Sequence, residues 1–206
     1  EAGLQCCKIV ASNSLDEYLI RDLMMQEAKI DTFGVGERLI TAKSAPVFGG
    51  VYKLAAVEDE QGNIIPKIKI SENTAKITNP HYKKLYRFYD NESGKALADE
   101  LCVYDETIDS TKPHTIFDPD AIWKTKTLTN YTARELHVTV FKNGELVYKQ
   151  PSLYEIRIYC AEQLETLWDE VKRFENPHTY YVDLSKKLWD IKNALLEKSK
   201  DGKDLK

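Results

Sequence analysis

The chain has 206 residues, enough for one large domain or two small ones. Its 33 acidic and 29 basic side chains give a formal net charge of -4, whereas proteins that bind nucleic acid without sequence specificity usually carry a basic surplus. A hydrophobic content of 42% argues against wholesale disorder, and charged residues interrupt every stretch long enough to cross a membrane. We therefore expect neither nucleic acid nor a membrane as a partner.

The cysteines and the first residue give two further indications about the kind of protein. The four cysteines include no CxxC pair, which indicates neither a disulfide scaffold nor a zinc knuckle. The chain begins with Glu1 rather than Met, shows no signal-peptide pattern, and enters a dense apolar pattern within a few residues. We expect a further portion of the protein upstream of Glu1.

Residues 1–48 alternate predicted strands with predicted helices. The strands are expected at 8–11 and 30–33, and a short helix is expected near 37–41. The first helix is expected to begin at Ser14-Leu15-Asp16-Glu17, which has the pattern of a capping box. The apolar face of this helix contains Leu15, Leu19, Ile20, Leu23, Met24 and Ala28. This order predicts a βαβα unit with two parallel strands and a right-handed crossover.

Residues 49–150 are rich in predicted strands. The expected strands are 51–57, 64–70, 84–89, 97–104, 137–141 and 145–149. Turn sequences occur at 59–63 and 90–94, and Asn143-Gly144 is a strong signal for a type I′ hairpin. Because Pro66 cannot donate a backbone hydrogen bond, its strand is expected at an edge or a bulge.

Residues 151–206 are predicted to be helical. Ser152 and Glu155 have the spacing of a capping box. The apolar stripe of the helix that follows contains Ile156, Tyr159, Leu164, Leu167, Trp168 and Val171. After a break at Asn176-Pro177, a second apolar stripe contains Leu184, Leu188, Ile191 and Leu195. The charged tail from Lys198 is expected to fray.

The two strand-to-helix junctions of the N-terminal zone are the strongest candidate for a binding site. Ser12 and Asn13 follow the first strand, and Gly34, Gly36 and Glu37 follow the second. Ligands of parallel α/β sheets bind at the carboxyl ends of strands, and the free amides of a helix N-terminus favour an anion. These residues predict a phosphate-binding site. The alternative for an isolated glycine pair is a tight turn without a ligand, and the Glu37 carboxylate repels phosphate unless it turns away.

The remaining reactive side chains form no catalytic pattern. No metal-ligand spacing occurs, so structural or surface roles are expected for His81, His114, His137 and His178. Cys6 and Cys7 have no evident activating partner, and no Ser/His/Asp set is visible.

Five ordered segments together form a far more specific pattern than any single motif. They are 8–18 (KIVASNSLDEY), 30–36 (IDTFGVG), 49–54 (GGVYKL), 66–71 (PKIKIS) and 76–80 (KITNP). These segments resemble the C-terminal portion of the nicotinate phosphoribosyltransferase family, and with the helical tail the similarity extends over essentially the whole chain. The resemblance favours the phosphate-binding site over the tight turn.

The resemblance implies a type II phosphoribosyltransferase fold, an α/β fold (α+β overall) with an irregular barrel. Residues 1–48 are then the last βα units of a barrel, with the phosphate-binding loops. Two such units cannot close a barrel of eight, so the barrel is incomplete in this chain. Residues 49–150 are then a β-rich region, and residues 151–206 are C-terminal helices.

The resemblance also implies an activity, the condensation of nicotinate with phosphoribosyl pyrophosphate to give nicotinate mononucleotide and pyrophosphate. In the family this step of NAD biosynthesis uses Mg²⁺ and is coupled to ATP hydrolysis through a phosphorylated histidine. That histidine and the arginine that contacts nicotinate are expected upstream of Glu1. This chain is then expected to contain no catalytic residue and to be inactive alone, while the full-length enzyme is expected to be a cytoplasmic homodimer.

By the same resemblance, the site residues bind the 5-phosphate of the substrate. These are Ser12, Asn13, Gly34, Gly36 and the backbone of Glu37. Magnesium is expected to neutralise the leaving pyrophosphate in the full-length enzyme.

The chain departs from the family at two positions. Many relatives have threonine where this chain has Glu37, so a hydroxyl contact to phosphate is missing. Where relatives have Pro-Gly, this chain has Pro80-His81. If that turn requires a positive φ, His81 is strained by about 1 kcal/mol.

Two alternatives to this function remain open. One is a related enzyme that uses nicotinamide or quinolinate, whose discriminating residues lie upstream, although residues 49–54 and the helical tail favour nicotinate. The other is a non-catalytic assembly subunit, such as one chain of a split protein.

Overall fold

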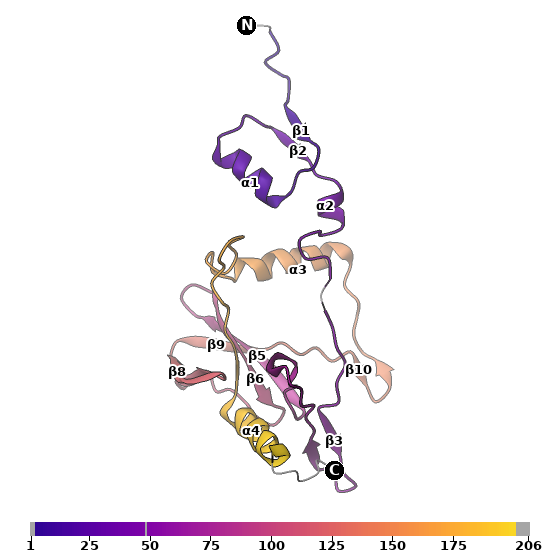
Figure 1. The fold of residues 1–206 in the computed structure, drawn as a ribbon, viewed down its shortest axis with the longest axis vertical. Coiled ribbons are helices and arrows are strands. Elements are labelled where there is room, and N and C mark those ends of the chain that lie inside the picture. Colours follow the sequence, from indigo (N-terminus) through magenta and orange to yellow (C-terminus); the bar gives the residue numbers. More distant parts are fainter. Residues whose placement is uncertain (1–2, 48, 201–206) are drawn as a thin grey trace. The chain divides into compact units, whose positions relative to one another are not determined.

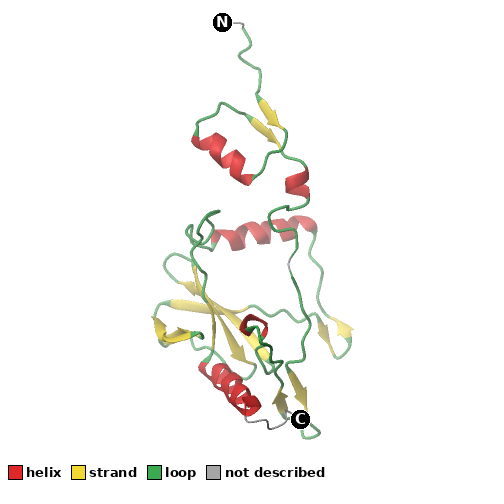
Figure 2. Ribbon diagram, viewed as in Figure 1, coloured by secondary structure: helices red, strands yellow, loops and turns green. Residues whose placement is uncertain are grey.

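The computed structural model describes residues 3–47 and 49–200. The chain divides into two compact units, Glu1–Tyr52 and Lys53–Lys206. The end of the N-terminal zone at Phe48 and the last six residues of the charged tail lie outside the described residues. Strands and helices alternate in the first unit, whereas a mixed sheet forms the centre of the second (Figures 1 and 2).

The first unit contains two short strands, each followed by a helix. The elements are β1 (Val10–Ser12), α1 (Glu17–Met25), β2 (Thr32–Gly34) and α2 (Glu37–Ile40). β1 and β2 pair in parallel, so that Ser12 lies opposite Gly34. The predicted βαβα order and the parallel pair are confirmed. No closed barrel occurs among the described residues, whose sheets have two or four strands.

The predicted capping box at Ser14 and Glu17 is wrong. α1 begins at Glu17, and its N-cap is Asp16, whose carboxylate accepts a hydrogen bond of 2.8 Å from the Leu19 amide. Asn13 and Ser14 have φ values of 89° and 51°, so the backbone makes a left-handed turn before the helix. This turn moves the cap by two residues, from a serine to an aspartate that also suits this position.

The second unit is built around a four-stranded sheet in the order β12-β6-β5-β9. These strands are β12 (Val182–Leu184), β6 (Ala96–Val103), β5 (Lys83–Asp90) and β9 (Tyr131–Glu135). β5 is antiparallel to both of its neighbours, and β12 joins the edge in parallel with β6. The remaining elements are β3 (Ala56–Glu58), β4 (Ile64–Pro66), η1 (Thr74–Lys76), β7 (His114–Asp118), β8 (Ala121–Leu128), β10 (Phe141–Lys142), β11 (Glu145–Leu146), α3 (Leu153–Glu165) and α4 (Lys186–Lys200).

The predicted hairpins of the second unit are confirmed, although the strands expected at 137–141 and 145–149 are restricted to β10 and β11. Four strands, β7, β8, β9 and β12, were not predicted. β5 and β6 flank the turn at 90–94, and β10 and β11 flank Asn143-Gly144, where both residues have positive φ. The strand expected at 51–57 is restricted to β3. The strand expected at 64–70 ends at Pro66, as β4. β7, β8 and β9 lack a clear apolar alternation, and the six central residues of β8 are all exposed.

The core of the second unit lies between the sheet and the β7–β8 hairpin. Phe88 is fully buried there, meets Tyr131 edge-on and stacks on His114. The buried members of this cluster are Tyr86, Phe88, Ala98, Cys102, Ile116, Leu128 and Tyr131. A second cluster joins α4 to the sheet through Leu188, Leu184 and Val103.

The helical zone differs from its prediction in two places. The capping box at Ser152 and Glu155 is confirmed. The helix that it starts, α3, ends at Glu165 and has no buried residue, so the apolar stripe expected to continue to Val171 is wrong. Leu184 and Leu188 are both buried as expected, but Leu184 belongs to β12 rather than to the last helix.

Candidate functional site

The five site residues named from the sequence line one pocket of the first unit, with a volume of about 360 Å³. We call it the first-unit pocket. Its lining residues are Ser12, Asn13, Ser14, Leu15, Gly34, Gly36, Glu37, Arg38 and Lys43. The parallel pairing of β1 and β2 produces this arrangement, because both strands end at the same edge and each then leads toward a helix.

Ser12 and Gly34 approach each other closely at the base of this pocket. The Ser12 hydroxyl donates a hydrogen bond of 3.3 Å to the Gly34 carbonyl. A Cβ atom at position 34 would lie 3.1 Å from the Ser12 Oγ. A side chain at position 34 would therefore press against Ser12, which would have to shift by a few tenths of an ångström. Gly36 has open space where its Cβ would be, and it is the N-cap of α2.

The charged side chains of the pocket are arranged in two ion pairs. Arg38 Nη1 lies 2.8 Å from Asp16 Oδ2, which ties α2 to the cap of α1. Lys43 Nζ lies 3.7 Å from Glu37 Oε1. The Glu37 carboxylate is thus drawn toward a lysine. The Leu39 and Ile40 amides of α2 donate to the Gly36 carbonyl, so the donors that the pocket offers an anion are the two paired cations and the backbone amides of Glu37 and Arg38.

Sequence reasoning missed the two cations of this pocket. Arg38 and Lys43 follow Glu37 by one and six residues. The signal that could have found them is their position in the turns that follow the second strand end, where basic side chains can reach a ligand at the helix N-terminus.

The two glycines of the pocket are expected to respond differently to alanine. Gly34→Ala places a Cβ against Ser12, and such overpacking typically costs about 1 kcal/mol or more. We expect the amides of β1 and β2 to exchange hydrogen about tenfold faster in this variant. Gly36→Ala meets no protein atom within 4 Å and is expected to leave the exchange rates unchanged. Equal effects of both substitutions on these rates would show that the strand contact is unimportant.

The histidines are scattered, as expected. His114 Nε2 lies 2.8 Å from Glu100 Oε2, and His81 stacks on Tyr104. His81 has a φ of 78°, so the positive φ considered for this turn does occur. Within residues 3–47 and 49–200, no three His, Cys, Asp or Glu side chains are grouped so that they could hold a metal ion. No helix in the same ranges is long and apolar enough to cross a membrane.

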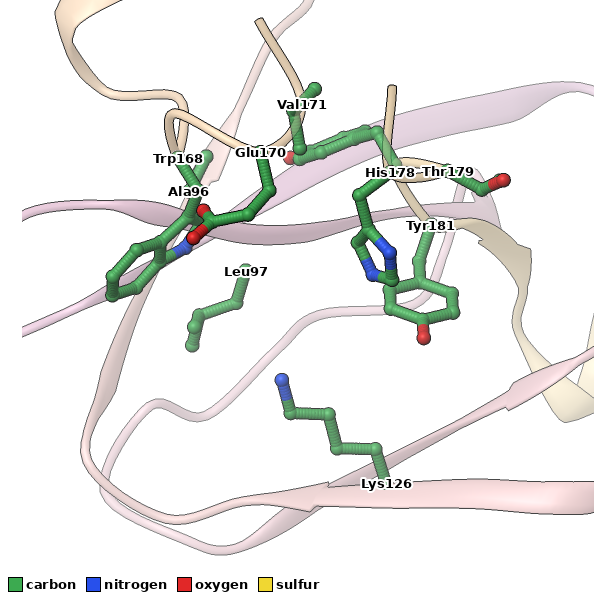
Figure 3. Close-up of a pocket in the computed structure, with 10 residues that line it drawn as sticks. Ala96, Leu97, Lys126, Trp168, Glu170, Val171, His178, Thr179 and Tyr181 are labelled. Atoms are coloured by element: carbon green, nitrogen blue, oxygen red, sulfur yellow. The ribbon is translucent and has the colours of Figure 1, made fainter. Parts of the chain in front are cut away.

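The second unit has a further pocket that the sequence did not indicate, with a volume of about 340 Å³. Figure 3 shows Trp168, His178 and Tyr181 at this pocket, with the Lys126 side chain extending toward Leu97. These residues come from separate segments of the chain, which the fold brings together. We call it the Trp168 pocket.

Comparison with known proteins identifies the family. The family model described as the nicotinate phosphoribosyltransferase C-terminal domain matches residues 82–192, more than half of the chain. The chain therefore belongs to this family.

Curated relatives extend the similarity to both units. Nicotinate phosphoribosyltransferase of Bacillus subtilis is 41% identical over 192 residues, which are 93% of this chain and 39% of the relative. The protein of the same name from Caenorhabditis elegans is 33% identical and is matched over 33% of its length. This chain thus spans between a third and two fifths of the length of these relatives.

A solved structure supports the fold. The crystal structure of human nicotinic acid phosphoribosyltransferase matches 93% of this chain and 33% of its own chain, with a TM-score of 0.65 and 24% sequence identity. This likeness supports a mixed α+β fold for the chain.

Proposed function

We propose that this chain is the C-terminal part of an enzyme that condenses nicotinate with phosphoribosyl pyrophosphate to nicotinate mononucleotide and pyrophosphate, an entry step of NAD biosynthesis. The observation that carries the proposal is the 41% identity to a nicotinate phosphoribosyltransferase over 93% of the chain. That match includes segments of both units, so the proposal concerns the first unit as well as the matched domain.

The first-unit pocket is the proposed site for the 5-phosphate of the ribose. The Arg38 and Lys43 side chains and the backbone amides of Glu37 and Arg38 are the proposed donors to the phosphate. Gly34 allows the two strand ends to lie close enough to face one phosphate. Glu37 opposes the anion, and its ion pair with Lys43 reduces that opposition.

Binding of the 5-phosphate contributes to the reaction by positioning the ribose. The ring nitrogen of nicotinate attacks the anomeric carbon of the ribose as the bond to pyrophosphate breaks. This displacement needs little proton transfer, so catalysis depends on alignment and on stabilisation of charge. A fixed 5-phosphate sets the orientation of the sugar relative to the nicotinate ring.

The remaining parts of the reaction are proposed to lie in the rest of the full-length protein. They include the phosphorylated histidine that couples ATP hydrolysis and the contacts to nicotinate and Mg²⁺. Since the described residues contain no three-ligand group, no step through magnesium is assigned to this chain. The full-length enzyme is proposed to be a cytoplasmic homodimer, and this chain alone is proposed to lack turnover.

A titration of the isolated chain with ribose 5-phosphate tests the phosphate site. We expect saturable amide shifts at residues 12–15 and 34–38 in ¹⁵N–¹H spectra, and no such shifts with ribose. In a parallel assay the isolated chain should form no nicotinate mononucleotide. If ribose 5-phosphate leaves these amides unmoved, the site assignment is wrong, and if the isolated chain forms product, its active site is complete.

A further inference from the structure

Asp183 is a buried acid of the second unit. It lies in the middle of β12, opposite Glu100 of β6, and only 4% of its surface is exposed. Glu100 is equally buried, but its carboxylate meets His114 Nε2 at 2.8 Å. Within the described residues, no hydrogen bond or ion pair reaches the Asp183 side chain. Buried charges in proteins are normally paired. Since the described residues leave no fully enclosed side-chain oxygen without a hydrogen bond, the unpaired Asp183 carboxylate must reach open space.

Asp183 lines a second pocket of this unit, with a volume of about 340 Å³. We call it the Asp183 pocket. Its lining residues are Ile116, Phe117, Asp118, Lys124, Thr125, Lys126, Tyr181 and Asp183. Two of these residues are aromatic, Phe117 and Tyr181, and two are acids, Asp118 and Asp183.

The lysines of the pocket do not neutralise Asp183. Lys124 Nζ lies 3.7 Å from Asp118 Oδ2, so this lysine forms an ion pair with the other carboxylate of the pocket. The Lys126 side chain extends toward Leu97 in the neighbouring Trp168 pocket (Figure 3). Burial, together with the like charges of Asp118 and Glu100, raises the pKa of Asp183 to about 6, and no lysine lowers it.

We propose that the Asp183 pocket binds a guanidinium group carried on an alkyl chain. Two carboxylates match the several N–H donors of a guanidinium, which is also less strongly hydrated than an ammonium and stacks on aromatic rings such as those of Phe117 and Tyr181. A bare metal ion is disfavoured because the described residues provide no three-ligand group.

The guanidinium has two possible sources. One is an arginine side chain from the portion of the longer protein that this chain does not include, since the chain covers only 39% of its Bacillus subtilis relative. The other is a free ligand. This inference does not depend on the proposed activity of the first unit.

Binding is expected to depend on pH. The groups that face or adjoin Asp183 are Asp118 and His114 of β7, Glu100 of β6, Lys124 and Lys126 of β8, and Tyr181. Because its pKa is raised in the folded chain, protonated Asp183 favours the folded state below pH 4, and that stabilisation is lost as the pH rises through about 6. A guanidinium needs the ionised form, so its affinity should fall about tenfold between pH 7.5 and pH 5.

The experiment titrates the 206-residue chain with n-propylguanidinium, and with n-propylurea as its neutral counterpart. At pH 7.5 we expect saturable amide shifts at residues 116–118 and 181–183, and binding at least tenfold tighter than that of n-propylurea. Asp183→Asn should weaken the binding of n-propylguanidinium at least tenfold, because the amide keeps the shape of the side chain and removes its charge. The control is Asp120→Asn, at an exposed aspartate two residues from Asp118, which should leave the binding of n-propylguanidinium unchanged.

Comparing this chain with the longer protein distinguishes a free guanidinium ligand from an internal arginine. If n-propylguanidinium binds both this chain and the longer protein, the site takes a free ligand. If it binds this chain but not the longer protein, an internal arginine already fills the pocket. Equal binding of n-propylurea, unchanged binding in Asp183→Asn, or the absence of saturable shifts in this chain would overturn the proposal.

Discussion

Arg87→Met should lower the free energy of unfolding of the second unit by about 3–5 kcal/mol. Arg87 Nε and Nη2 lie 2.7 and 2.8 Å from the two oxygens of Asp99, which is 5% exposed. Removing the guanidinium leaves this carboxylate buried, and the Tyr180 hydroxyl is then its one side-chain donor among the described residues. Urea unfolding followed by tryptophan fluorescence measures the loss.

The neighbouring strand offers a matched control. Arg134 of β9 lies opposite Arg87 in the register but is exposed. Arg134→Met should cost less than about 1 kcal/mol. Adding Asp99→Asn to Arg87→Met should recover part of the loss, because the neutral amide still accepts from Tyr180. Similar losses for both arginines would show that burial of Asp99 does not decide the effect.

In the full-length enzyme, Arg38→Met should lower kcat/KM for phosphoribosyl pyrophosphate about tenfold to a hundredfold. This range corresponds to about 1.5–3 kcal/mol for a lost hydrogen bond to a charged group. Glu37→Gln should act in the opposite direction and raise kcat/KM about twofold to tenfold, because it removes a repelling charge and frees Lys43 from its ion pair. Steady-state kinetics with phosphoribosyl pyrophosphate as the varied substrate measure both effects.

Lys8→Met is the control for these kinetics. Lys8 pairs with Asp31 at 3.1 Å in the same unit but does not line the first-unit pocket. This variant should retain the wild-type kinetics, and the KM for nicotinate should stay constant in all three variants. Opposite signs for Arg38→Met and Glu37→Gln are the signature of an anion site, and a loss of kcat/KM in both would argue against it.

Local signals in the sequence predicted the parts of the fold that local chemistry decides. Asn143-Gly144 tolerates the positive φ values of a hairpin, and Ser152 with Glu155 satisfies the first amides of α3. β8 could not be found in this way, because its exposed central residues show no apolar alternation: two adjacent apolar residues, Ile122 and Trp123, precede a run of alternating lysine and threonine at 124–127. Its pairing with β7 depends on contacts between strands.

In the candidate site, too, local sequence predicted some residues, whereas others depend on tertiary contacts. Strand-end position and glycine content pointed to Ser12 and Gly34, and the pairing of β1 with β2 brings them together. Arg38 was missed because its role depends on the tertiary turn that places it beside Asp16. Asp183 could not be singled out either, since the sequence does not reveal that β12 lies in parallel beside β6 and buries this acid.

The most direct test is an assay of the full-length protein that contains these 206 residues. Nicotinate, nicotinamide and quinolinate are offered separately with phosphoribosyl pyrophosphate, Mg²⁺ and ATP, and the mononucleotide products are separated and measured. We predict formation of nicotinate mononucleotide with a clear preference for nicotinate, and its loss when phosphoribosyl pyrophosphate is omitted. A preference for nicotinamide or quinolinate, or no mononucleotide from any of the three, would contradict the assignment.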